Sequence, residues 1–442
     1  VNLNHFMTIN EKTRLSSVLY WSGGSGGGTG TYGSSFRSPA VEGSRWYASS
    51  PWTWDWNAAI AANSNNVDTD FDASKNRSKG ILRNSINRQD TYGLISKLNY
   101  DVSDELELQV GLDWRTAGIE HAREVRDLLG GDYFVNKSNK NNTTPESQMQ
   151  GLGDIIAYHN STTVDWLGGF VQGKYTKDKL NLYGMGGLSS IKYSYQDHFT
   201  VANEVVKADA ISTFQVKGGA MYDVDDNVSI YVNSGYVEKP PIMDNVIYYD
   251  GTVASDPINE SFISSEAGVN FESEKFAVKV SAYNTDWKDR NLTKAVTTGQ
   301  GDSGDTDVIF LKGIGQKHQG LEIEGSMKLN DMIRLDGAVS FGKWKFDGDA
   351  DGLYTEYDEE APIQTSYTYT LDGLFVGDQP QTAYVLGTTL TPMAGLRIQG
   401  IFKMYDKNYA DWSPDSRELS GDADRSQVWQ APAYNRLDLH AA

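Results

Sequence analysis

The sequence alternates very short with very long connections between strands that carry one apolar and one polar side. The clearest example is residues 320–342, where a four-residue polar turn separates two such runs. Because side chains on a strand repeat every two residues, the pattern predicts a hairpin with one oily and one charged face. The apolar side carries Leu321, Ile323, Met327, Leu329, Ile333, Leu335, Val339 and Phe341, and the polar side carries Glu322, Glu324, Ser326, Lys328, Arg334, Asp336 and Ser340.

Seven strand pairs of this kind follow one another, and a final run from Pro432 to Ala442 predicts a fifteenth strand. Their short turns lie at 10–12, 101–104, 176–179, 223–227, 272–275, 329–332 and 391–395. The long connections are rich in Gly, Asn, Asp, Ser and Tyr, which is typical of loops. They span roughly 22–87, 122–162, 199–210, 239–260, 291–316, 346–379 and 411–430.

This regular exchange of turn and loop predicts the fold class. In an antiparallel up-and-down meander, alternate connections lie at opposite ends, so one rim is short and the other elaborate. Transmembrane β-barrels of outer membranes have this layout, with short periplasmic turns and long extracellular loops. We therefore predict an all-β transmembrane barrel whose apolar face meets lipid and whose polar face lines a wet interior. The alternative is a water-soluble propeller or sandwich, which does not explain the sorted loop lengths.

A transmembrane barrel leads to two further predictions. Many strands exceed the ~10 residues needed to cross a bilayer, so their outer ends should project as a hydrophilic rim. Aromatic residues near strand ends fit interfacial girdles; they are Tyr20, Trp21, Tyr100, Trp114, Tyr175 and Trp287.

Composition narrows the partners. The chain carries 39 Lys plus Arg against 59 Asp plus Glu, a formal net charge of -20, which argues against nucleic acid because phosphate binding needs a basic surface. The absence of Cys excludes disulfides and thiolate metal sites. No apolar run approaches the length of a transmembrane helix.

The ends of the chain suggest that it is part of a longer protein. Val1 to Asn4 already reads as the middle of a strand, and the chain does not begin with Met. Single-chain bacterial barrels have even strand numbers, and an open edge in lipid leaves backbone groups unpaired at several kcal/mol each. We expect residues 1–442 to be a partial barrel domain.

Several stretches resemble the barrel of TonB-dependent outer-membrane receptors of the Bacteroidetes type. The ordered series is more specific than any single piece. It includes "LNHFMTINEKTRLSSVLYWSGGSGGGTGTYG" (3–33), "REVRDLLGGDYFV" (123–135), "YVNSGYVEKPPIMDNV" (231–246), "YNTDWKDRNLTKAV" (283–296), "KGIGQKHQGLEIEGSMK" (312–328), "DGLFVGDQPQTAYVLGTTL" (372–390) and "APAYNRLDLHAA" (431–442).

The resemblance implies about 22 strands around an N-terminal plug domain. The fifteen predicted strands would then be numbers 6 to 20, with the plug, the first strands and the last two strands outside this sequence. It also implies energy coupling to the TonB–ExbB–ExbD complex through the missing N-terminal region.

No catalytic set stands out, so we expect a non-enzyme that requires no cofactor. The six His are scattered, and neither G-x-S-x-G nor H-E-x-x-H occurs. The acidic stretch 347–360 is more specific. Asp347, Asp349, Asp351 and Asp358 match positions 1, 3, 5 and 12 of an EF-hand-type calcium loop. A strand precedes it instead of a helix, so the interpretations are a Ca2+ site that stiffens an extracellular loop and a solvated acidic loop.

The longest loop is rich in aromatic residues that could stack against sugar rings, peptides or flat organic ligands. They are Trp46, Tyr47, Trp52, Trp54 and Trp56, and the alternative is that they form the loop's own small core. The glycine-rich run 23–33 lacks the lysine of a phosphate-binding loop, and we expect mobile backbone there.

These observations favour active, TonB-dependent uptake of a scarce solute across the bacterial outer membrane. Siderophores, cofactors, peptides and oligosaccharides all remain open as the ligand. One alternative is a SusC-type glycan or peptide importer that works with a surface lipoprotein. Another is a passive porin or surface-adhesion barrel.

Overall fold

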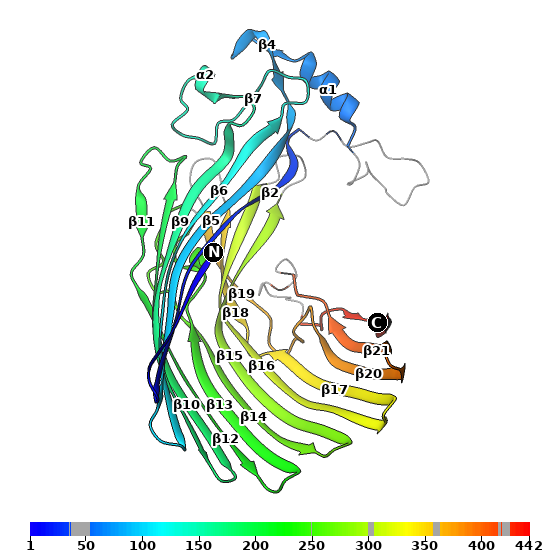
Figure 1. The fold of residues 1–442 in the computed structure, drawn as a ribbon. Coiled ribbons are helices and arrows are strands. Elements are labelled where there is room, and N and C mark those ends of the chain that lie inside the picture. Colours follow the sequence, from blue (N-terminus) through cyan, green and yellow to red (C-terminus); the bar gives the residue numbers. More distant parts are fainter. Residues whose placement is uncertain are drawn as a thin grey trace.

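A computed structural model describes residues 1–34, 36, 54–248, 250–298, 305–356, 363–413, 417 and 425–442. Fifteen long strands dominate this part of the chain (Figure 1). They are β1 (Asn2–Asn10), β2 (Thr13–Gly33), β5 (Gly80–Asp101), β6 (Leu106–Asp127), β9 (Ile155–Lys177), β10 (Leu180–Asp197), β12 (Ile211–Asp223), β13 (Val228–Lys239), β14 (Glu260–Glu272), β15 (Phe276–Thr298), β16 (Asp305–Asn330), β17 (Ile333–Phe346), β20 (Pro380–Met393), β21 (Leu396–Tyr409) and β23 (Tyr434–Ala441).

The long strands form one curled antiparallel sheet in which each strand pairs with its neighbours along the chain (Figure 1). All seven predicted hairpins are confirmed, with the turns where the alternation placed them. Four short strands were not predicted and bring the described sheet to nineteen. They are β11 (Val205–Lys207), β18 (Ala350–Glu356), β19 (Ile363–Tyr369) and β22 (Gln430–Ala431).

Several predicted loops are in fact the outer ends of strands. The glycine-rich run 23–33, expected to be mobile, is the second half of β2 and pairs residue by residue with 80–90 of β5. Gly27 shows why glycine stands here, since an added Cβ would collide with the carbonyl oxygen of Ser85. The prediction of a loop was wrong because local composition carries no information about a partner strand 47 to 67 residues away in the sequence.

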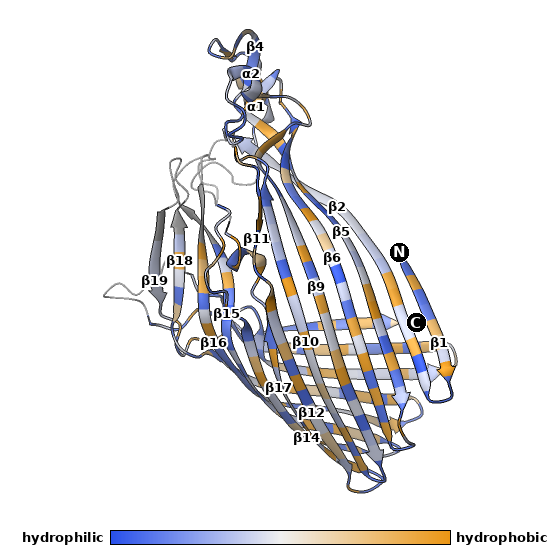
Figure 2. Ribbon diagram, turned by 90° about the vertical axis from the view of Figure 1, so that its left-hand side faces the viewer, coloured by the Kyte–Doolittle hydropathy of each residue, from blue (hydrophilic) through white to orange (hydrophobic). Residues whose placement is uncertain are grey.

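The register confirms the two faces of the sheet. Leu321 pairs with Phe341 and Ile323 with Val339, while Glu322 pairs with Ser340. Residues alternate between hydrophobic and hydrophilic along the long strands (Figure 2). No other part of the described protein covers these apolar side chains: Leu321 is 39% exposed and Phe341 is 42% exposed. A propeller or sandwich would bury this face against a second sheet, so that alternative is wrong.

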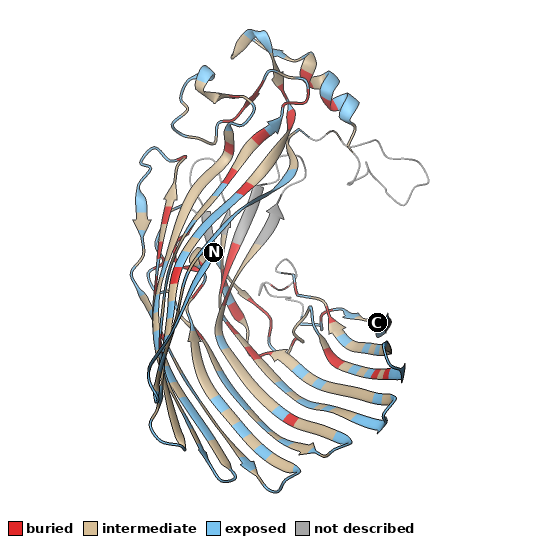
Figure 3. Cartoon of the chain, in the orientation of Figure 1, coloured by how far each residue is buried: buried red, intermediate tan, exposed pale blue. Residues whose placement is uncertain are grey.

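The buried apolar side chains of the described residues gather towards the end that carries the long loops, whereas the lower halves of the strands are mostly intermediate or exposed (Figure 3). One cluster joins the upper ends of β5, β6 and β9 through Ile81, Val125 and Ile156. The largest joins β16 and β17 to the loops that follow β17 and β21. The buried core of the described residues therefore lies where the outer ends of the strands meet the long loops, and it holds the rim together.

The described parts of the first two long loops, between β2 and β5 and between β6 and β9, together form a small module at this end (Figure 1). It holds a second sheet of β3 (Val67–Asp68), β4 (Asp72–Ser78), β7 (Tyr133–Val135) and β8 (Met149–Gln150), with helices α1 (Trp56–Ser64) and α2 (Pro145–Gln148). Elsewhere, the 3-10 turn η1 (Met243–Asn245) lies in the loop after β13. Among the described residues, no helix is long and apolar enough to span a membrane.

Asn63 ties the module to the sheet. Its side chain is fully buried and its Nδ2 donates to the carbonyl oxygens of Gly80, Leu128 and Leu129 at 2.8–3.1 Å. Its Oδ1 accepts the backbone N–H of Lys79 at 2.8 Å. One amide thus satisfies four backbone groups from two different loops, which fixes the module on the sheet.

Candidate ligand-binding site

Two rows of cross-strand neighbours form the inner wall near the loop-bearing end. Trp287 of β15 pairs with Gln316 of β16, and Gln316 pairs with Phe346 of β17. In the next row, His318 of β16 pairs with Trp344 of β17. Directly paired residues share one face of a sheet, and these lie on the side of Glu322 and Glu324, which is the interior.

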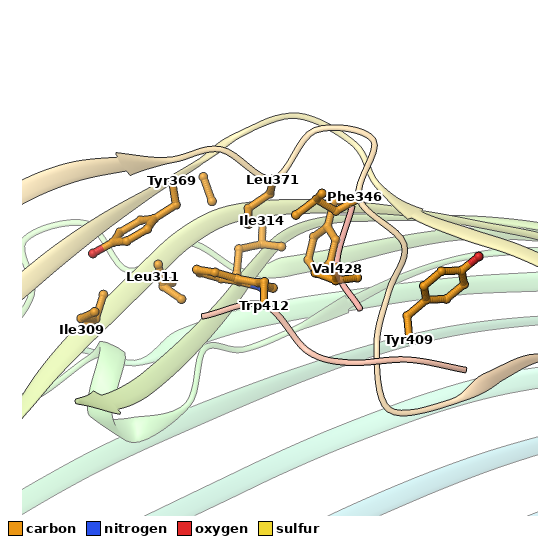
Figure 4. Close-up of a cluster of buried hydrophobic side chains, with 11 residues drawn as sticks. Ile309, Leu311, Ile314, Phe346, Tyr369, Leu371, Tyr409, Trp412 and Val428 are labelled. Atoms are coloured by element: carbon orange, nitrogen blue, oxygen red, sulfur yellow. The ribbon is translucent and has the colours of Figure 1, made fainter. Parts of the chain in front are cut away.

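Two loops fold onto this wall and close a pocket above it. Figure 4 shows Trp412, Leu371 and Val428 from the loops packed around Leu311 and Ile314 of β16. These apolar residues are at most 9% exposed. Burying a large apolar side chain contributes about 1.5–3 kcal/mol, so the cluster anchors the loops to the wall.

The pocket between wall and loops has a volume of about 720 Å³. It combines aromatic rings, cations and amides with a few apolar side chains, a mixture suited to orienting an organic ligand. Its polar and aromatic lining includes Trp287, Arg290, Lys294, Gln316, His318, Asp378, Asp411 and Trp412.

Lys294 links β15 to the loop that follows β21. Its Nζ lies 2.7 Å from a carboxylate oxygen of Asp411 and donates to the carbonyl oxygen of Trp412 at 2.9 Å. The same ammonium lies 4.3 Å from the centroid of the Trp412 ring. Only 18% of the Lys294 side chain is exposed, against 47% of Asp411, so the ammonium is largely shielded while its carboxylate partner reaches solvent. These contacts fix the loop side of the pocket.

Glu260, at the start of β14, orients Trp287. Its fully buried carboxylate accepts the indole N–H of Trp287 at 3.2 Å, the ammonium of Lys239 at 3.1 Å and the backbone N–H of Asn291 at 3.3 Å. A buried carboxylate is costly unless its oxygens are satisfied, and three donors achieve this. The Arg290 guanidinium lies over the Trp287 ring, 4.4 Å from its centroid.

The second row of the wall is a chain of aromatic contacts. The rings of His318 and Trp344 stack with centroids 5.5 Å apart, and the indole N–H of Trp344 donates to the hydroxyl of Tyr283 at 2.9 Å. The Nε2 of His318 lies 3.0 Å from Oε1 of Gln316. This chain fixes the rotamer of Gln316, whose amide lies on the pocket wall.

The sequence analysis missed this pocket because its residues come from segments far apart in the chain. Trp287 was expected in an interfacial girdle, and this was wrong, since its side chain faces the interior and donates to Glu260. The alternation within this strand could have predicted the inward direction of Trp287. Phe276, Val278 and Val280 face outward, so the odd-numbered Trp287 lies on the opposite, inner face. Lys294, Gln316 and Trp412 lie in the segments 291–316 and 411–430, which the sequence pattern predicted to be loops.

The predicted aromatic ligand site is partly described. Trp54 and Trp56 stack with centroids 5.7 Å apart at the start of α1, while Trp46, Tyr47 and Trp52 lie outside the described residues. Trp54 and Trp56 do not line the pocket described above. Their ligand-binding role stays a prediction.

The acidic stretch places its carboxylates on separate partners. Oδ1 of Asp349 accepts the backbone N–H groups of Leu371 and Asp372, and its other oxygen lies 3.2 Å from Arg425. Burial opposes ionisation of Asp349, but the Asp372 N–H and the Arg425 guanidinium outweigh it and hold its pKa below the usual value.

The other acids of this stretch do not converge with Asp349. Asp347 lies 3.5 Å from Lys317, Asp351 accepts the hydroxyl of Thr368, and Asp358 lies outside the described residues. Within the described part of the chain, no group of three or more His, Cys, Asp or Glu is arranged to hold a metal ion. Calcium binding here stays a prediction.

Comparisons with known proteins agree with this architecture. Residues 4–442 match the family model described as TonB dependent receptor-like, beta-barrel. No curated protein matched the chain.

Solved structures of similar fold include the ferric-catecholate import receptor Fiu of E. coli, with a TM-score of 0.56 and 12% identity over 99% of this chain and 56% of that one. The ferric citrate transporter FecA has a TM-score of 0.59 and 10% identity over 100% of this chain and 53% of that one. The pyoverdine receptor FpvA of Pseudomonas aeruginosa has a TM-score of 0.57 and 15% identity, covering 100% and 54%.

At these identities the likeness establishes the fold alone, and this chain spans about half the length of those receptors. The family match is broader, because it extends over nearly the whole chain. The chain belongs to the TonB-dependent receptor-like β-barrel family.

Proposed function

We propose that this chain is the greater part of a receptor that takes up a scarce solute across the outer membrane with energy from TonB. The observation that carries the proposal is the family match over residues 4–442, together with a pocket at the loop-bearing end of the barrel wall. The long loops would capture the solute, and the interior would conduct it inward. The family consists of receptors and transporters, so we propose no bond-breaking step.

The solved structures of similar fold favour an iron chelate or a related metal complex as cargo. They include receptors named for ferric catecholate, ferric citrate and pyoverdine. A SusC-type glycan or peptide importer with a surface lipoprotein, and the Bacteroidetes type itself, stay secondary proposals. Coupling to TonB–ExbB–ExbD is proposed for the whole protein.

Uptake by intact cells tests the proposal. Wild-type cells, a strain lacking this receptor and a strain lacking TonB would be given a mixed pool of ferric chelates, cobalamin, peptides and oligosaccharides. Mass spectrometry would then measure which solute leaves the medium. We expect at least one solute to be depleted by the wild type and spared by both mutants. Depletion that needs the receptor but continues without TonB would show a passive porin instead.

A further inference from the structure

The pocket at the inner wall contains a cation that no carboxylate neutralises directly. Among the described residues, Arg290 makes no ion pair and no hydrogen bond, and its guanidinium rests on the ring of Trp287. Glu260 and Asp411 are its electrostatic neighbours. Glu260 is occupied by three donors, and Asp411 binds Lys294 and the backbone N–H of Trp412. The guanidinium therefore keeps its N–H groups available.

Two buried N–H groups on the same pocket also have no partner within the described residues. Gln316 is 2% exposed, its Oε1 is held by His318, and its Nε2 makes no hydrogen bond. Trp412 is 4% exposed, and its indole N–H is likewise unpaired. Buried polar groups are almost always paired, so two orphaned donors on one pocket point to an acceptor that a ligand would bring.

The acids of the pocket do not remove this surplus of donors. Asp411 is already occupied, and Asp378 is exposed at the loop side. Arg290 and Gln316 line the pocket together with the apolar side chains of Leu292 and Val376 and the ring of Trp287. The arrangement offers hydrogen-bond donors on one side and apolar surface next to them.

We propose that this pocket binds a carboxylate group of the cargo, with Arg290 as the charged donor and Gln316 as the neutral donor. A guanidinium presents N–H groups in a fork that matches a carboxylate, and the bond is stronger where water is excluded. The net charge of -20 repels anions generally, so an acid would bind only where donors are concentrated, as they are in this pocket. The apolar side chains that also line the pocket would favour an acid that carries an apolar body. The inference deepens the proposed function and rests on it.

A pair of isosteric probes tests the carboxylate directly. Binding of 4-fluorobenzoate and 4-fluorobenzamide to the full-length receptor in detergent micelles would be measured by fluorine NMR. The two probes share the ring and differ in charge. We expect the benzoate to bind about tenfold more tightly than the benzamide, since charge-assisted hydrogen bonds are roughly twice as strong as neutral ones. Equal affinity of the two probes would overturn the proposal.

Variants assign the binding to these residues. Arg290→Gln and, separately, Gln316→Glu should each abolish the preference for benzoate, the first by removing the cation and the second by replacing a donor with an acceptor. Arg334→Gln is the matched control, because Arg334 lies on the same inner face near the short turns and is paired with Asp336. Heat-modified mobility on gels would show that each variant keeps the barrel. A preference that survives both pocket substitutions would overturn the assignment.

This measurement is independent of transport. If uptake fails to depend on TonB while the benzoate preference follows Arg290, the proposed function falls and the carboxylate site stands. If uptake depends on TonB but benzoate and benzamide bind alike, the receptor function stands and the carboxylate site is wrong.

Discussion

At the scale of the residue, buried amides and carboxylates hold the rim where loops from distant parts of the chain meet. Asn63 bonds backbone groups at the end of the first long loop and at the start of the second, and Glu260 orients Trp287. Neither role could be predicted from the sequence, because an Asn in a helix and a Glu before a strand look like ordinary surface residues. Only their partners, which lie elsewhere in the sequence, make them structural.

Asn63→Asp should loosen the loop module without disturbing the barrel. Aspartate keeps the acceptor for the N–H of Lys79 but loses the donors to Gly80, Leu128 and Leu129. A buried carbonyl left unpaired costs about 1–3 kcal/mol; the carbonyl of Leu128 keeps the hydroxyl of Ser78 as a donor. Hydrogen-exchange mass spectrometry should show faster exchange in peptides covering 78–81 and 126–131.

Asn65→Asp is the control for this prediction. It is the same substitution two residues away, at an exposed side chain that bonds only the carbonyl of Ala61. Exchange in the two peptides should stay as in the wild type. Equal exchange in the Asn63 and Asn65 variants would show that Asn63 does not anchor the module.

At the scale of the element, the alternation of apolar and polar residues predicted which strands exist but not how far they run. All fifteen long strands are recovered, since period-two patterning is local. Their outer ends lose that pattern above the membrane, where both faces are wet, and β2 continues there through a glycine-rich run. Short strands such as β18, which pairs with β16, also lack a two-residue pattern of apolar residues, and the sequence therefore did not predict them.

The loops that follow β6 and β10 meet beside two histidines at the outer ends of β9 and β10, and the charge of His198 should respond to pH. The rings of His159 and His198 lie 4.3 Å apart, and Lys140 N–H donates to the Phe199 carbonyl beside them. Burial lowers the pKa of His198, and repulsion from His159 lowers it further; Asp197 and Glu120 act in the opposite direction. Arg88 and His159 both contact Glu120, and burial of Glu120 is outweighed by them, so its pKa is lowered.

The lowered pKa of His198 makes this contact weaken in acid. The open state takes up the proton first, so stability from neutral His198 is present above about pH 6.5 and is lost as the pH falls towards the folded pKa. Hydrogen exchange of residues 139–142 and 197–200 should therefore accelerate between pH 7.5 and 5.5 after correction for intrinsic rates. His198→Gln should flatten this dependence, and an unchanged profile in that variant would refute the role of His198.

At the scale of the whole molecule, the sequence predicted an up-and-down sheet with one apolar face, and the structure confirms it. The binding pocket could not be predicted, because it forms where loops after β17 and β21 fold back onto β15 and β16. Such packing depends on apolar residues scattered through polar loops, which carry no period. The strands of the wall can therefore be predicted from the sequence, whereas the loop packing that forms the pocket cannot.

The two faces should differ sharply in their tolerance of charge. Val171 of β9 is 53% exposed on the apolar face, and Gln172 follows it on the opposite face. Val171→Arg should lower the free energy of unfolding in lipid vesicles by about 2–4 kcal/mol, the cost of Arg near the bilayer midplane. Gln172→Arg, the matched control, should leave it almost unchanged in the same urea titration. Equal losses in both variants would contradict the assignment of the faces.

The most direct test of the account is which solvent each face of the 320–342 hairpin meets. Residues 1–442 contain no Cys, so single nitroxide labels can be placed by Leu321→Cys, Glu322→Cys, Ile323→Cys and Glu324→Cys in a full-length protein in which any Cys outside these residues is replaced by Ser. Electron paramagnetic resonance in lipid vesicles would then compare relaxation by oxygen, which concentrates in lipid, with relaxation by a water-soluble nickel chelate. We predict that labels at 321 and 323 respond to oxygen and labels at 322 and 324 to nickel. Four positions with the same preference, or alternation of the opposite sign, would contradict a barrel wall between lipid and water.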